Sequence, residues 1–152
     1  MAKTKAIKIP STASKAAALL ANSEKGFIVP TAAQKKNIMV ALAKSGKVVY
    51  GRAYDIIKIK GGKFDLSSAE QVEKHVGRLM IYEIKSTTRD IGPNFPQYFF
   101  ALTTAELLVA QSLKDQFKFV FVNIKREYIL ELTLQQVFKR SRGIYPSWSI
   151  SF

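Results

Sequence analysis

The sequence has no cysteine, a single histidine and no long apolar run. The lack of cysteine excludes disulfides and thiolate zinc ligands. The single histidine, His75, falls in a predicted surface helix, so serine–histidine catalysis and zinc sites with two histidines are not expected. No apolar stretch approaches the roughly 20 residues that cross a bilayer, and no apolar core follows the basic start. We therefore expect a cytoplasmic protein with no membrane partner.

Acidic residues are also scarce, with 11 Asp and Glu against 24 Lys and Arg and a formal net charge of +13. Up to Tyr54 the chain has ten basic residues and one acid, Glu24. Such a surface attracts polyanions over a screening length of about 8–10 Å in physiological salt. Nucleic acid is the commonest polyanionic partner of a compact domain, so we expect it here.

Length and patterning predict one α/β domain over residues 11–152, after a basic flexible arm at 1–10. Helices are expected over 11–22, 32–45, 65–76, 103–113 and 133–139. Strands are expected over 47–50, 53–60, 79–86, 98–102, 117–124 and 127–132. Thr31 and Thr103 are natural N-caps, Asp65 or Ser67 is expected to cap the third helix, and Gly46 is expected to end the second.

The strand expected at 79–86 carries two ionisable side chains at the end of an apolar run. Glu83 and Lys85 are two residues apart, so on a strand they project from the same face. Burying such groups costs free energy unless a metal ion or a mutual ion pair compensates. A divalent cation at Glu83, with Lys85 facing the same space, makes a compact hydrolytic site. The alternative is a structural ion pair on an exposed sheet face.

Asp55 is the natural third member of this site, because it lies at the edge of another apolar strand. If the two strands are neighbours, the carboxylates of Asp55 and Glu83 converge on one cation. Mg²⁺ suits this set, since it prefers oxygen ligands and keeps several waters. Lys85 would then hold the attacking water and counter the charge developing on phosphorus. Asp65 is the alternative to Asp55 as the first carboxylate ligand of the metal, although N-capping or simple solvation also explains Asp65.

Asp55, a connecting segment and Glu83-Ile84-Lys85 resemble the PD-(D/E)XK nuclease superfamily, which includes many type II restriction endonucleases. The sequence segments around them, Gly51 to Asp55 and Tyr82 to Ser86, are similar to those of small restriction enzymes. Tyr54-Asp55-Ile56, Glu83 to Thr87 and the helix that starts Thr103-Thr104-Ala105-Glu106 also resemble the C-terminal domain of NO VEIN proteins. The similarity in element order covers roughly residues 31–139.

The resemblance implies a restriction-endonuclease-like fold, with a central mixed β-sheet flanked by helices. It also implies DNA cleavage that depends on Mg²⁺, with Mn²⁺ as a possible substitute. Asp55, Glu83 and Lys85 would be catalytic, and Asp55, Glu83 and the backbone carbonyl of Ile84 would hold the metal. A homodimer is expected if both strands are cut, since two-fold symmetry matches a palindromic target. The related roles of resolvase and repair nuclease stay open, as does a non-catalytic nucleic-acid-binding protein of the same fold.

Several basic residues are candidates for phosphate contacts. They are Lys35, Lys36, Arg52, Arg89, Lys139, Arg140 and Arg142. For the lysines of the second helix, a solvated helix face is an equal alternative. Glu106 is expected in the first turn of its helix, where an acid interacts favourably with the helix dipole. Tyr145 and Trp148 in the tail are open to three uses: packing on the domain, stacking on a base or meeting a second subunit.

Overall fold

Four strands and five α-helices make up the part of the chain that the computed structural model describes, residues 11–51 and 53–152. The expected basic arm at 1–10 and Arg52 lie outside it. The elements run in the order α1 (Thr12–Asn22), α2 (Ala32–Lys44), β1 (Ile56–Ile59), α3 (Ala69–His75), β2 (Leu79–Thr87), α4 (Thr104–Leu113), β3 (Phe117–Asn123), β4 (Tyr128–Leu132) and α5 (Leu134–Arg140). Single 3₁₀ turns follow α3 and α4.

The strands form one mixed sheet in the order β1-β2-β3-β4. β1 runs antiparallel to β2, β2 parallel to β3, and β3 antiparallel to β4. The parallel step requires a crossover, which α4 provides, whereas β3 and β4 are joined by a tight turn. The prediction of an α/β protein with a mixed sheet is therefore confirmed. β2 and β3 are the central strands, each paired on both sides, and β1 and β4 are the edges.

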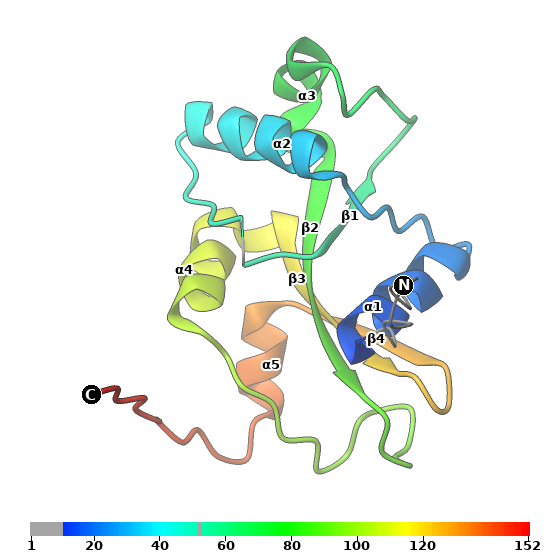
Figure 1. The fold of residues 1–152 in the computed structure, drawn as a ribbon, viewed down its shortest axis with the longest axis vertical. Coiled ribbons are helices and arrows are strands. Elements are labelled where there is room, and N and C mark those ends of the chain that lie inside the picture. Colours follow the sequence, from blue (N-terminus) through cyan, green and yellow to red (C-terminus); the bar gives the residue numbers. More distant parts are fainter. Residues whose placement is uncertain (1–10, 52) are drawn as a thin grey trace, which may run out of the picture.

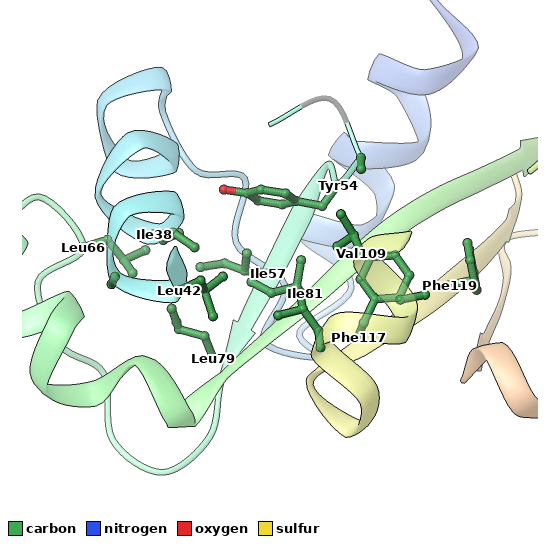
Figure 2. Packing of buried hydrophobic residues seen from close by; sticks show 14 of the residues in the cluster. Ile38, Leu42, Tyr54, Ile57, Leu66, Leu79, Ile81, Val109, Phe117 and Phe119 are labelled. Atoms are coloured by element: carbon green, nitrogen blue, oxygen red, sulfur yellow. The ribbon is translucent and has the colours of Figure 1, made fainter. Parts of the chain in front are cut away.

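Helices cover both faces of the sheet, α1 on one and α4 and α5 on the other (Figure 1). The side chains of β2 alternate between these faces. Leu79 and Ile81 pack with residues of α2 and α4 in the larger core, part of which Figure 2 shows. Met80 and Tyr82 pack towards α1 on the other face. Burying each aliphatic side chain of this size contributes about 1.5–3 kcal/mol, so the alternation fixes the register of the strand.

The helices begin and end close to their predicted positions. Thr31 and Thr103 each cap a helix, and Thr133 caps α5 in the same way. Gly46 follows α2 with φ 80°, the left-handed conformation in which glycine ends a helix at little cost. The predicted caps of α3 were wrong, because Ser68 accepts from the Gln71 N–H instead.

Two predicted strands, at 47–50 and 98–102, do not form. In the first segment, the N–H of Lys47 donates to the end of α2 and that of Val48 to the hydroxyl of Ser112, which leaves neither for a sheet. Residues 98–102 have no strand to pair with on β3, since β2 and β4 already occupy both of its edges. The aromatic side chains there serve packing instead, with the Phe100 ring 5.0 Å from that of Phe121.

Residues 141–152 leave the domain as an extended segment after α5 (Figure 1). Tyr145 and Trp148 are 75% and 89% exposed, so neither packs on the domain. Within the described residues, no helix has both the length and the apolar character needed to span a membrane.

Candidate active site

Glu83 and Lys85 continue the row of Leu79 and Ile81 along β2, and so they face α4. The prediction that they share one face of the strand is confirmed, since Lys85 Nζ lies 3.5 Å from Glu83 Oε1. Both side chains are largely buried, with 13% of the Lys85 side chain and 10% of the Glu83 side chain exposed. β3 pairs with β2 along both residues, whereas the β1 ladder ends at Tyr82, so backbone pairing with β3 holds Glu83 and Lys85 in place.

Asp55 lies beside Glu83, immediately before β1. Its backbone N–H donates to the carbonyl of Tyr82 at 2.9 Å, and its Oδ2 accepts from the N–H of Ile84 at 2.9 Å. Tyr82 and Ile84 are the residues on either side of Glu83, so these two bonds place Asp55 next to Glu83, just beyond the end of the β1–β2 ladder. Asp65 is elsewhere, on an exposed turn where its Oδ1 accepts from the Ser67 N–H at 2.9 Å. Of the two candidate first carboxylates, only Asp55 is beside Glu83.

Glu106 is a fourth member of the cluster, although its sequence context predicts only a place in the first turn of its helix. Its two carboxylate oxygens lie 3.0 and 2.9 Å from Lys85 Nζ. Oε2 also accepts from the N–H of Thr103 at 3.0 Å, which completes the capping box of α4. The Thr-x-x-Glu spacing marks the cap in the sequence, but contact with Lys85 depends on how α4 packs on the sheet.

The cluster is short of positive charge, since it has three carboxyl groups and the Lys85 ammonium contacts those of Glu83 and Glu106. Burial raises the pKa of Glu83 to about 9, helped by the charge of Asp55 and by the hydrogen bond and charge of Glu106, and against the effect of Lys85. Burial also acts to raise the pKa of Glu106, but hydrogen bonds from Lys85 and from the Thr103 N–H outweigh it and hold that pKa below its ordinary value. At neutral pH Glu83 is therefore protonated in the metal-free protein, while Glu106 is ionised.

The donor set at Glu83 fits a hard divalent cation. Glu83 Oε2 is buried and has no hydrogen-bond partner within the described chain, an arrangement that costs free energy unless something binds there. Across residues 11–51 and 53–152, no three His, Asp or Glu side chains come together as a metal-holding group. The predicted set is smaller, two carboxylates and the carbonyl of Ile84. Mg²⁺ accepts such a set because it keeps several waters.

Lys35 borders the site from α2. Its Nζ donates to the carbonyl of Tyr54 at 2.9 Å and lies 4.8 Å from the centre of the Tyr54 ring. The buried Tyr54 ring is labelled in Figure 2, where it lies between α2 and the strands. This lysine thus braces the residue that precedes Asp55, and its ammonium is near the site whether or not it reaches a phosphate.

The other basic candidates are spread over the surface. Lys36 and Arg89 are exposed, and so are Lys139, Arg140 and Arg142 around the end of α5. Arg140 donates to the carbonyl of Asn94, which ties the end of α5 to the loop between β2 and α4. The structure does not bring these cations to the carboxylate cluster itself.

The chain matches no protein-family model, no curated protein and no solved structure. The fold defines an α/β protein with a four-stranded mixed sheet. Its most distinctive chemical feature is the cluster of Asp55, Glu83, Lys85 and Glu106, in which the two glutamates are buried.

Proposed function

We propose that this protein is a magnesium-dependent DNA endonuclease with a restriction-endonuclease-like fold. The observation that carries the proposal is that Asp55, immediately before β1, lies beside Glu83 of β2, whose carboxylate contacts Lys85. A mixed sheet whose central strand presents Glu-x-Lys, with an acid at the start of the neighbouring strand, is the arrangement expected from the family resemblance. The unpartnered, buried oxygen of Glu83 supports a cation at this place.

Asp55 and Glu83, with the carbonyl of Ile84, would hold the metal. When bound, Mg²⁺ or Mn²⁺ supplies Lewis acidity to a phosphoryl oxygen and neutralises charge on the leaving group. Glu83 would lose its proton on binding, because a carboxylate ligand has to be ionised. Asp55 stays in position through its bond to the Ile84 N–H.

Lys85 would contribute to the chemistry through its ammonium group. The group lies 3.5 Å from Glu83, so it adjoins the place where a phosphate would meet the metal ligands. There it can donate a hydrogen bond to the attacking water and stabilise negative charge developing on the phosphate oxygens. A cation in a site this buried acts more strongly than one in water, because little solvent screens it.

The substrate follows from the charge of the whole chain. A formal net charge of +13 favours binding to the phosphate backbone of DNA, which carries no sequence information. Lys35, Lys36, Arg52, Arg89, Lys139, Arg140 and Arg142 are proposed as phosphate contacts. One such site cuts one strand, so a homodimer would cut both strands of a two-fold symmetric target. Restriction, junction resolution and repair all fit this chemistry.

Nicking of supercoiled plasmid tests the proposal. We expect relaxed circles to form with Mg²⁺, and none to form with EDTA or with Glu83→Gln in Mg²⁺. The Glu83→Gln variant keeps the shape of the side chain and removes the charge that holds the cation. Nicking by the variant at the wild-type rate, or no nicking by the wild type with either Mg²⁺ or Mn²⁺, would contradict the proposal.

The second candidate is a non-catalytic nucleic-acid-binding protein of the same fold. The observation in its favour is that, over the described residues, no group of three His, Asp or Glu side chains forms a metal site. This candidate predicts DNA affinity that falls steeply with salt and does not change when Mg²⁺ is exchanged for EDTA at constant ionic strength.

A further inference from the structure

Three helices of the described part of the chain begin with the same capping motif, and one of them differs chemically. The three capping boxes are Thr31–Gln34 of α2, Thr103–Glu106 of α4 and Thr133–Gln136 of α5. In each, the third-residue side chain accepts from the threonine N–H at 2.9 to 3.0 Å. The geometry is the same with an amide or a carboxylate, so capping alone does not require the charge of Glu106.

The charge of Glu106 lies at a buried position, where it costs free energy. Glu106 is only 5% exposed, whereas the glutamine boxes are at exposed positions. Burying a carboxylate costs more free energy than burying an amide, unless an opposite charge is close. A glutamine here would keep the cap and avoid that cost. The carboxylate therefore has a second purpose.

That purpose is visible in its other partner. Both oxygens of Glu106 contact Lys85 Nζ, at 3.0 and 2.9 Å, which is closer than the 3.5 Å to Glu83. Lysine has a flexible four-carbon stem, so its ammonium occupies one place only if several groups hold it. The N-terminus of α4 thus fixes the head group of Lys85 from one side, while β2 fixes its backbone.

We infer that Glu106 is a positioning residue that holds Lys85 in place for the hydrolytic step, an inference that rests on the function proposed above. Glu106 acts through Lys85 and does not itself touch the substrate. Losing it leaves the ammonium free to swing away from Glu83, and misplacing a catalytic group by about 1 Å lowers rates by about 100-fold. Substrate binding, which depends on the basic surface, is unaffected.

The experiment compares Glu106→Gln, Glu106→Ala and Gln136→Ala with the wild type. Glu106→Gln keeps the cap and removes the charge, while Gln136→Ala breaks the equivalent cap of α5 and leaves Lys85 alone. We expect both Glu106 variants to lose about 10- to 100-fold in kcat for DNA cleavage with KM unchanged. Gln136→Ala is expected to retain the kcat of the wild type. Equal losses in Gln136→Ala and Glu106→Gln, or a change in KM alone, would overturn the inference.

A second measurement does not depend on nuclease activity. Heteronuclear NMR of the lysine ammonium groups should show a protected signal for Lys85, assigned by its absence in Lys85→Arg. In Glu106→Gln we expect fast proton exchange with water to broaden this signal beyond detection. In Gln136→Ala the signal should persist. Persistence in Glu106→Gln would overturn the inference whatever the activity. If the signal requires Glu106 but the wild type cuts no DNA, the positioning holds and the proposed function fails.

Discussion

Asp55 Oδ2 accepts a hydrogen bond from the backbone N–H of Ile84 at 2.9 Å. Ile84 is the residue whose carbonyl is proposed to bind the metal, so one side chain both supplies a ligand and holds the strand that supplies another. This link ties the start of β1 to the middle of β2 beyond the ladder itself. It also makes the structural and chemical roles of Asp55 separable by mutation.

Asp55→Asn and Asp55→Ala should therefore differ in stability and agree in activity. Asparagine keeps an oxygen for the Ile84 N–H, whereas alanine leaves that donor without its partner, at a cost of about 1–3 kcal/mol. Both remove the carboxylate and should lose metal-dependent cleavage by at least about 100-fold. Thermal denaturation and plasmid nicking measure the two effects. Cleavage by Asp55→Asn at the wild-type rate would remove Asp55 from the site.

Stability should fall as pH rises, because of Glu83. Its pKa is about 9 in the folded protein and near its ordinary value of 4.5 when unfolded, so the folded state keeps a proton that the unfolded state loses. The contribution is complete below pH 4.5 and declines between 4.5 and 9, by up to about 1.4 kcal/mol per pH unit. Lys85 opposes this shift, while Asp55 and Glu106 add to it.

Urea unfolding in EDTA at several pH values between 5 and 9 measures this slope. Glu83→Gln cannot ionise, so its stability should be nearly independent of pH across that window and should exceed the wild-type value at pH 8. Parallel pH profiles for the two proteins would show that Glu83 ionises normally and is not desolvated.

Mg²⁺ should stabilise the wild type and not Glu83→Gln. A ligand that binds only the folded state at ten times its Kd adds about 1.4 kcal/mol, or about 3–5 °C in Tm for a domain of this size. The gain should grow from pH 6 to pH 8, because the metal displaces a proton from Glu83. Differential scanning calorimetry with and without Mg²⁺ checks this. An equal rise in Glu83→Gln would place the bound ion elsewhere.

Neutralising the cations at the end of α5 should weaken DNA binding mainly at low salt. Lys139, Arg140 and Arg142 are exposed, so replacing each by alanine should cost little stability beyond the bond that Arg140 donates to the Asn94 carbonyl. The logarithm of the DNA-binding constant falls linearly with the logarithm of salt concentration, and each lost phosphate contact makes this slope shallower by about 1. Fluorescence anisotropy over a salt series measures it, with the exposed Lys74 of α3 as the control position. An unchanged slope would show that this segment does not contact DNA.

The local parts of the site could be predicted from the sequence because they depend on strand periodicity. The shared face of Glu83 and Lys85 follows from their spacing on a strand with apolar neighbours. The position of Asp55 needed one further assumption, that β1 pairs with β2, which the ladder confirms. Short apolar runs and threonine caps likewise placed most helices and strands near their observed bounds.

The features that could not be predicted from the sequence depend on contacts between segments that are distant along the chain. Glu106 is 21 residues from Lys85, and no local pattern states that α4 packs with its first turn over β2. The aromatic run at 98–102 favours a strand by composition, yet the Tyr98 hydroxyl donates to the carbonyl of Ser86 and the ring packs near Phe121. Strand propensity was overridden there because the sheet had no free edge beside it.

The most direct test of the central claim is the single-turnover cleavage rate of Lys85→Ala, measured beside its DNA affinity in Ca²⁺. If the ammonium of Lys85 assists hydrolysis next to a cation held by Asp55 and Glu83, the variant should lose cleavage to the limit of detection and keep the Kd of the wild type. Cleavage at the wild-type rate would contradict the account, since Lys85 would then be only a structural ion-pair partner with no part in the reaction.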